Sequence, residues 1–234
     1  MAPRSKVAVS VVVSPSVNHR TVVGISRRKK TEARIIEAGL QVFAEKGPYA
    51  PIVDDIVKAA GIARGTFYNY FNSTSELLEA TSAYLATDLV ESIENEIKHI
   101  KDPVIHHGVG LRLWMKKARI SKAWCGYMTS IWFKGGFVFE APLRNIRRGL
   151  KSGDFSCPSV ECAWDLSVGT IRQAMIRLLV DPKLAKSNYE DQIAYTVLQG
   201  LGASQEKLRQ VLDYPLPEVR RSAKSIPDDD GAFP

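Results

Sequence analysis

The sequence predicts an all-α protein with a short N-terminal tri-helical unit and a longer C-terminal series of helices. Apolar residues recur at spacings of three and four from Thr31 to about residue 213, which is the period of amphipathic helices. Glycine and proline interrupt this pattern repeatedly, whereas neither a βαβ alternation nor a repeat of fixed period is found. The 234 residues are 45% hydrophobic and 24% charged, so one or two globular domains are expected.

Residues 1–30 differ from the rest of the chain in both pattern and charge. They show no helical period, and they hold seven of the 32 Lys and Arg side chains and no acidic residue, so the remaining chain carries 25 charges of each sign. We expect a largely disordered basic arm. A concentrated basic segment beside a folded domain is a footprint of polyanion binding, although a merely solvated tail is the alternative. The strongest candidates for contacts are Arg27, Arg28, Lys29 and Lys30.

The tri-helical unit is expected within residues 31–76. The first helix has an apolar stripe at Ala33, Ile36, Leu40 and Phe43, and it ends at Gly47-Pro48. A second helix covers about 52–60, is broken by Gly61, and is followed by a third over about 64–71, whose inward side chains are Phe67, Tyr70 and Phe71.

Ser73 followed by Glu76 forms a capping-box pattern that opens a long helix to about Ile100. Further helices are expected at 104–119, 121–134, 141–151, 159–180, 188–201 and 204–213, with a short strand or loop at 135–140. The predicted domains are therefore the arm 1–30, the tri-helical unit 31–76, a helical domain 77–214 and a flexible tail 215–234.

The turn around Gly61 points to a helix-turn-helix. Glycine is free of a Cβ clash in the turn, and apolar residues at Ile56, Ile62 and Phe67 brace the two helices. A small, polar outer face on the second of these helices suits the major groove of DNA. Candidate contacts on that face are Arg64 to phosphate or guanine, Gly65 for close backbone approach, Thr66 to a base, Tyr68 to phosphate and Asn69 to adenine.

The residues of this unit resemble the N-terminal domain of the tetracycline-repressor (TetR) family, most densely from Asp55 to Phe71. The similar stretches are TEARIIEAGLQVFAEKG (31–47) and VDDIVKAAGIARGTFYNYFNSTSELLEA (53–80). The resemblance implies a dimeric repressor that is usually released by a ligand, with Thr66 at a base-contacting position and Tyr68 at a phosphate-contacting one.

Three positions depart from the family pattern. Pro51 stands where the family often has a phosphate-binding threonine, Ala63 replaces a capping serine, and Thr74 replaces a phosphate-binding lysine. Thr74 is kept as a candidate contact, and the basic run at 27–30 is well placed to compensate along the DNA backbone or in the minor groove.

The domain 77–214 is expected to bind an effector. Aromatic and methionine side chains are dense over residues 111–139, which suits a pocket for an apolar or aromatic small molecule, although an ordinary core is the alternative. Candidate pocket residues are Trp114, Met115, Trp124, Tyr127, Met128, Trp132 and Phe133. The adjacent His106 and His107 point apart on a helix and lack a partner, so a loop or cap role is favoured over a metal site.

The predicted helices 159–180 and 188–201 are candidates for a dimer interface. Their wide apolar faces could form a four-helix bundle across a twofold axis, or could be buried within one subunit. The candidate interface residues are Trp164, Ile171, Met175, Ile193 and Val197.

Several other classes are excluded or unsupported. No phosphate loop, nucleophile elbow, paired metal motif or glycine-rich fingerprint is found, so neither an enzyme nor a cofactor is indicated. No run approaches 18 apolar residues, and three cysteines give no disulfide framework, so a cytoplasmic protein with no membrane partner is expected. The sequence thus predicts a homodimeric regulator of double-stranded DNA with a palindromic operator, released by a small molecule. The alternative is a non-sensing DNA-binding dimer, controlled by a protein partner or acting architecturally.

Overall fold

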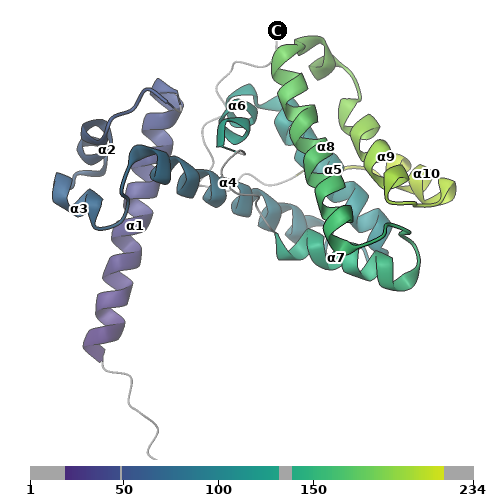
Figure 1. Cartoon of the computed structure of the whole chain (residues 1–234), viewed down its shortest axis with the longest axis horizontal. Helices are drawn as coiled ribbons and strands as arrows, with labels where there is room; N and C mark the ends of the chain where they lie inside the picture. The colour runs from purple at the N-terminus through teal and green to yellow at the C-terminus, as the bar shows by residue number, and fades with distance from the viewer. Residues whose placement is uncertain (1–18, 48, 132–138, 219–234) are drawn as a thin grey trace, which may run out of the picture.

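The computed structural model describes residues 19–47, 49–131 and 139–218, and within these ranges all regular structure is helical (Figure 1). The prediction of an all-α fold is confirmed. The helices are α1 His19–Lys46, α2 Val53–Ala60, α3 Arg64–Tyr68, α4 Thr74–Ile97, α5 Pro103–Ile120, α6 Lys122–Ile131, α7 Glu140–Ser152, α8 Val160–Val180, the 3-10 helix η1 Pro182–Lys186, α9 Tyr189–Gly200 and α10 Gln205–Asp213.

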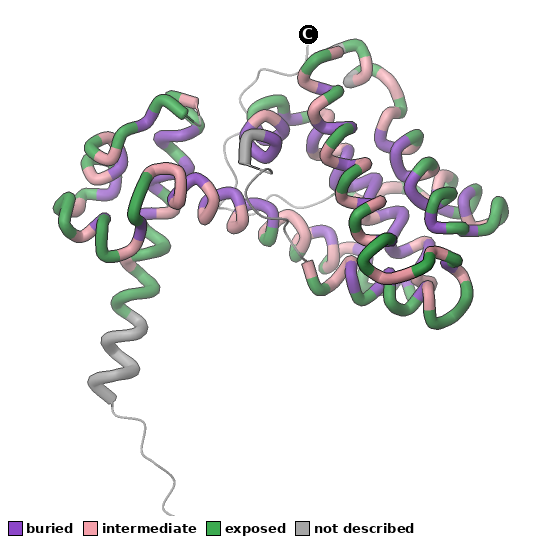
Figure 2. The backbone as a smooth tube through the Cα atoms, in the orientation of Figure 1, coloured by how far each residue is buried: buried purple, intermediate pink, exposed green. Residues whose placement is uncertain are grey.

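Two parts are joined by α4. Helices α1, α2 and α3 gather at one end of the molecule, and α4 runs from them into the bundle of α5 to α10 (Figure 1). Ile35, Phe43, Ile56 and Phe67 are completely or almost completely buried and form the centre of the small unit. A Cβ on Gly39 would stand 2.9 Å from Leu77 Cδ2, so glycine at this position lets α1 and α4 pack closely. The buried residues lie on the sides of the helices that face one another (Figure 2).

The first helix begins at His19 and not at Thr31, so the predicted disordered arm is wrong for residues 19–30. Residues 27–30 are exposed on this helical extension. Basic residues are good helix formers, but the exposed basic run 27–30 gives no apolar stripe that would reveal the helix in the sequence. Ala33 is also exposed, because the buried face of α1 is centred on Ile35, Leu40 and Phe43.

The connection from α3 to α4 differs in detail from the prediction. Helix α3 ends at Tyr68, earlier than the expected residue 71, and Phe71 is nevertheless buried. Ser73 Oγ accepts a hydrogen bond from the Glu76 amide at 3.1 Å, which is the expected cap. The Glu76 carboxylate does not return to Ser73, however. It accepts from the backbone and side-chain nitrogens of Asn72 at 2.7 and 2.8 Å.

Helix α5 is the centre of the C-terminal domain and contacts α4, α6, α7, α8, α9 and α10. Its side chains are therefore buried on almost every side, including the polar ones of His106, His107 and Arg112. The beginning of the predicted flexible tail also packs, since Leu216 lies partly buried against the core. Residues 219–234 lie outside the described residues.

Candidate nucleic-acid interface and cavity

The turn between α2 and α3 depends on Gly61. Its φ of 60° and ψ of 43° lie in the left-handed region, where a side chain is strained although no atom lies within 4 Å of a built Cβ. The amide of Gly61 donates to Lys58 O at 3.3 Å, and the amide of Ile62 donates to Val57 O at 3.1 Å. These bonds close the end of α2 and aim the chain into α3.

Helix α3 presents its polar face to solvent. Arg64, Gly65, Tyr68 and Asn69 are exposed, Thr66 is half-buried, and Phe67 points inward with no exposed surface. The side chains predicted to contact DNA therefore stand where a duplex could reach them. Thr74, the first residue of α4, is half-buried near the same edge.

Arg64 is held by its neighbours in the free protein. Its Nη1 donates to Asp54 Oδ1 of α2 at 2.7 Å, and its Nη2 lies 3.4 Å from the hydroxyl of Tyr68. The guanidinium also lies 5.9 Å from the centre of the Tyr68 ring. These contacts orient two candidate phosphate-binding groups together, so that little side-chain freedom remains to be lost on binding.

The helical extension of α1 reaches the same surface. The Arg28 guanidinium lies 5.8 Å from the ring centre of Tyr70, which follows α3 in the chain. The basic run Arg27 to Lys30 is therefore carried on a helix beside α3 and not on a loose arm. Of the family departures, Pro51 is buried before the first residue of α2, and Ala63 begins α3 without a side-chain cap.

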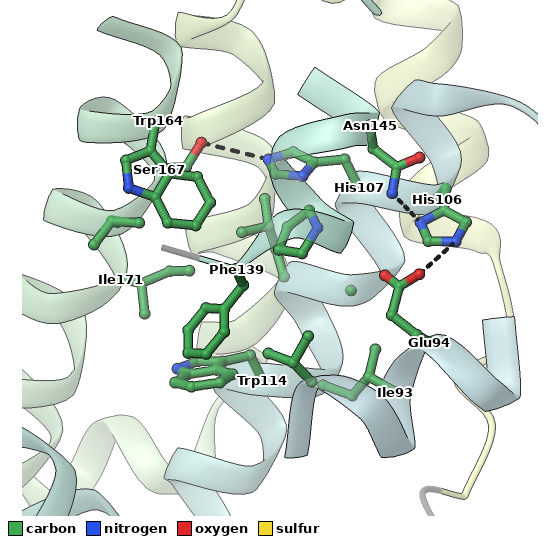
Figure 3. A pocket seen from close by; sticks show the side chains of 15 residues that line it. Ile93, Glu94, His106, His107, Trp114, Phe139, Asn145, Trp164, Ser167 and Ile171 are labelled. Carbon is green, nitrogen blue, oxygen red and sulfur yellow. Dashed lines mark hydrogen bonds and ion pairs between the residues drawn. The ribbon is translucent and has the colours of Figure 1, made fainter. Parts of the chain in front are cut away.

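A cavity of about 80 Å³ lies in the C-terminal domain between α4, α5, α7 and α8 (Figure 3). Its described lining is mostly apolar, with rings from three elements and a polar wall at one side. The lining residues are Val90, Ile93, Glu94, His106, His107, Gly110, Leu111, Trp114, Phe139, Pro142, Asn145, Trp164, Ser167, Val168 and Ile171.

The polar wall of the cavity contains a chain of hydrogen bonds that determines which ring nitrogen of His106 carries the proton. Arg148 donates to Asn145 Oδ1 at 3.3 Å, so the Asn145 amide nitrogen faces His106 Nδ1 at 2.9 Å and donates to it. The proton of His106 must then sit on Nε2, which points to Glu94 Oε2 at 3.6 Å (Figure 3). Burial and the nearby Arg148 and Arg144 lower the pKa of His106 to about 4, and burial raises the pKa of Glu94.

His107 is bound on the α8 side. Ser167 Oγ donates to the Ala163 carbonyl at 2.8 Å, so it accepts from His107 Nε2, which lies 3.4 Å away. The His107 ring meets the Phe155 ring edge-on, with centroids 6.1 Å apart. Burial lowers the pKa of His107 to about 4, so this imidazole is neutral at pH 7.

Buried His107 predicts a loss of stability in mild acid. The folded-state pKa lies near 4 and the unfolded value near 6.5, so the unfolded chain binds the extra proton between these pH values. The contribution of neutral His107 to the free energy of unfolding is complete above about pH 6.5 and is lost as the pH falls toward 4. The loss has reached about 2 kcal/mol at pH 5. Urea unfolding of the wild type and of His107→Gln across this range measures it. The variant should show a shallower decline, and parallel curves would contradict the assignment.

The predicted pocket residues are mostly core residues, and only Trp114 lines the cavity. Met115, Trp124, Tyr127 and Met128 are buried elsewhere, with Trp124 packed edge-on against Trp114 at 5.2 Å between ring centroids, and Tyr127 hydrogen-bonded to Thr81. Large side chains fill space, so aromatic density marks a core more readily than a cavity. Trp132 and Phe133 lie outside the described residues.

The sequence prediction missed the polar residues of the cavity. The loop or cap role of His106 and His107 is wrong, because both are buried in α5 and diverge from it to different partners, Asn145 and Ser167. The signal for the two histidines was their position in the otherwise apolar first half of α5, PVIHHGVGL (103–111). Across the described parts of the chain, no group of three or more His, Cys, Asp or Glu residues could hold a metal ion.

Most of the residues predicted for the dimer interface are buried within the single chain. Met175 and Val197 are completely buried, and Ile171 and Ile193 are at most 9% exposed. Trp164 and Ile171 line the cavity, and Met175 Sδ accepts from Trp114 Nε1 at 3.4 Å. Burial within one subunit, the alternative, thus describes Ile171, Met175, Ile193 and Val197, whereas Trp164 is half-buried and its place in a dimer contact stays a prediction.

The arrangement of α2, the Gly61 turn and α3, braced by α1, defines a helix-turn-helix DNA-binding domain. Residues 35–81 match the family described as bacterial regulatory proteins, tetR family. The N-terminal unit is therefore a tetR-family helix-turn-helix domain, which confirms the resemblance. None of the helices in the described ranges is long and apolar enough to cross a membrane.

Two curated relatives match about a third of the chain. The HTH-type transcriptional regulator YvdT of Bacillus subtilis (strain 168) is 38% identical over 69 residues, which cover 30% of this chain and 36% of that protein. The fatty acid metabolism regulator protein of the same organism is 31% identical over 74 residues, 32% of this chain and 38% of that one. The chain thus matches little more than a third of the length of these relatives.

Solved structures extend the likeness to the C-terminal helices. RolR in complex with its ligand resorcinol gives a TM-score of 0.70 at 22% identity, over 84% of this chain and all of that one. The SmeT–triclosan complex gives 0.56 at 18% identity, over 81% of this chain and all of that one. At these identities the likeness shows a shared fold.

Proposed function

We propose that the chain is a homodimeric repressor that binds a palindromic operator through α3 and releases it when a small molecule fills the cavity. The observation that carries the proposal is the position of α4. It follows α3 directly in the chain, runs from the helix-turn-helix into the C-terminal bundle, and supplies Ile93 and Glu94 to the cavity wall (Figures 1 and 3). The RolR and SmeT structures, which resemble this chain in fold, each hold a small aromatic molecule.

Release of the operator follows from the geometry of the two DNA-binding domains of a dimer, its two heads, on one duplex. Two copies of α3 would enter successive major grooves about 34–36 Å apart. An effector that binds one cavity shape better than another shifts α4, and with it the separation of the heads. A ligand with equal affinity for both shapes has no effect. The protein acts in the cytoplasm, on the DNA that carries its operator.

The dimer contact of this proposal lies on the outward faces of α8 and α9. These helices carry exposed or half-buried apolar residues, among them Ile176, Val180 and Tyr195, and Gly169 of α8 is exposed and has no side chain. Pairing them across a twofold axis gives a four-helix bundle that leaves the buried faces of both helices undisturbed.

Footprinting on the DNA upstream of its own gene tests the proposal. We expect protection of a palindrome and its loss when an effector is added. Binding that ignores sequence would support an architectural protein instead, and a dimer that no small molecule stabilises in a thermal-shift screen would support control by a protein partner.

Replacing Arg27, Arg28, Lys29 and Lys30 by alanine should weaken operator and non-specific DNA binding equally. The logarithm of the binding constant falls as the logarithm of the salt concentration rises, and each lost phosphate contact makes this slope less steep by about 0.9. Fluorescence anisotropy at several salt concentrations measures the slope. The matched control removes four exposed basic residues of the C-terminal domain, Lys151, Lys183, Lys186 and Arg209. Equal slopes for both variants would contradict a specific role for the α1 extension.

A further inference from the structure

The charge of the cavity wall indicates which molecules it accepts. Among the described lining residues Glu94 is the only acidic side chain, and none is Lys or Arg. We infer that the cavity selects a small, uncharged aromatic molecule whose hydroxyl donates a hydrogen bond to the Glu94 carboxylate, and that Glu94 excludes aromatic carboxylates. This inference rests on the proposed function, since it names the class of effector.

The hydrogen bonds of the wall leave an acceptor facing the cavity. The Asn145 amide nitrogen donates to His106 and to the Ala141 carbonyl, and the Ser167 hydroxyl donates to the Ala163 carbonyl. His106 Nε2 and His107 Nε2 point to Glu94 and Ser167. The donors of these four side chains are thus directed at protein partners, and the Glu94 carboxylate is left as an acceptor for a donor on the ligand.

Glu94 can accept that donor. The contacts of its carboxylate with His106, at 3.6 Å, and with Arg144, at 3.9 Å, both involve Oε2. A carboxylate has about four acceptor sites, so the group can accept a hydroxyl in addition to these long contacts. A hydrogen bond from a neutral hydroxyl to a carboxylate is among the stronger kinds.

An anionic ligand has no positive partner in the wall. Arg144 is 57% exposed, so water screens it, and Arg148 is turned toward Asn145 and donates to the Lys101 carbonyl at 2.5 Å. Both histidines have a pKa near 4 and are neutral at pH 7. A carboxylate brought beside Glu94 would therefore meet a like charge in a site of low polarity, which is unfavourable.

The rest of the lining suits a planar ring. The rings of Trp114 and Phe139 are inclined at 49° with centroids 6.1 Å apart, and Trp164 and Ile171 stand on the α8 side (Figure 3). Aromatic pairs adopt tilted and offset arrangements of this kind, so a further ring can join them. The modest volume of about 80 Å³ favours a single-ring compound.

Calorimetric titration of the full chain with single-ring probes at pH 7.5 tests the inference. Phenol and resorcinol supply hydroxyl donors, toluene has none, benzoate is anionic and benzylammonium is cationic. We expect saturable binding of the two phenols, binding of toluene at least about tenfold weaker, and no measurable binding of benzoate. Benzylammonium binding that exceeds phenol binding would overturn the inference in favour of an organic cation.

Glu94→Gln keeps the size of the side chain and removes its charge. We expect phenol to bind this variant about tenfold more weakly and the ratio of benzoate to phenol affinity to rise at least tenfold. The control is Glu91→Gln, an exposed glutamate on the same helix outside the cavity lining, which should leave every affinity unchanged. Circular dichroism and the melting temperature of both variants report whether the fold is intact.

The failures of the two proposals are distinguishable. If benzoate binds the wild type as tightly as phenol does, or if Glu94→Gln leaves the ratio unchanged, the selectivity inference is wrong and the cavity remains an effector site. If none of the probes binds and none releases operator DNA in the footprinting assay, the inference is overturned together with the effector role of the cavity.

Discussion

Replacing Tyr68 by alanine is expected to abolish operator binding while the protein remains folded. Tyr68 is 46% exposed on α3, and its hydroxyl and ring both contact Arg64. The variant removes one phosphate donor and also frees Arg64 from the orientation that α3 gives it. A hydrogen bond to a charged group contributes about 1.5–3 kcal/mol. Because a dimer carries the change twice, the loss is about 3–6 kcal/mol, or more than 100-fold in operator affinity.

Fluorescence anisotropy with a labelled operator measures this effect. Tyr68→Phe should fall between the wild type and Tyr68→Ala, because it keeps the ring beside Arg64 and loses only the hydroxyl. Ile120→Ala is the control, since it also removes an exposed apolar side chain but from the end of α5 in the C-terminal domain. Wild-type affinity in a correctly folded Tyr68→Ala protein would show that this face of α3 does not enter the DNA interface.

The helix-turn-helix could be predicted because its signals are local. The left-handed conformation at Gly61, the buried Ile56 and Phe67, and the exposed Arg64 and Tyr68 all follow from residue types within about fifteen positions. Local rules govern turns and amphipathic helices, so one sequence is sufficient for them. The same rules could not find the start of α1 at His19, because residues 1–30 show no apolar period in the sequence.

The cavity could not be predicted because it is assembled from distant segments. Asn145 stands 39 residues from His106 and Ser167 stands 60 residues from His107, and each pair meets only when α7 and α8 pack on α5. A helix buried on all sides also loses the pattern that would tell its inner face from its outer one. The polar residues of α5 were visible in the sequence, but the partners that give them a role were not.

The dimer surface illustrates a related ambiguity. Helix α8 must bury one apolar stripe within its own subunit, which it does with Ile171, Met175 and Leu178. Other apolar residues, such as Ile176 and Val180, remain half-buried or exposed. Periodicity shows that both stripes exist, but only the packed structure shows which of them is turned inward. Of the α8 residues chosen from the sequence, Ile171 and Met175 belong to the inward stripe and Trp164 is half-buried.

Replacing Arg112 by methionine is expected to destabilise the C-terminal domain by about 3–5 kcal/mol. The Arg112 side chain is 7% exposed, and its Nε lies 2.7 Å from Asp191 Oδ1 on α9. Its Nη1 also donates to the carbonyls of Val211 and Tyr214, at 2.6 and 2.7 Å. One guanidinium thus joins α5, α9 and the end of α10. Methionine fills the space but leaves a carboxylate and two carbonyls without this donor.

Urea unfolding followed by circular dichroism measures the loss against a matched control. Arg147→Met breaks the ion pair with Glu140, which has a similar length of 2.9 Å but side chains that are 50% and 70% exposed. Water screens that pair, so the control should lose less than about 1 kcal/mol. Arg112→Met with Asp191→Leu should recover part of the loss, since no unpaired carboxylate then remains. Equally small losses for Arg112→Met and Arg147→Met would show that burial adds nothing to the Arg112 contacts, and that α9 and α10 are held to α5 by their apolar faces alone.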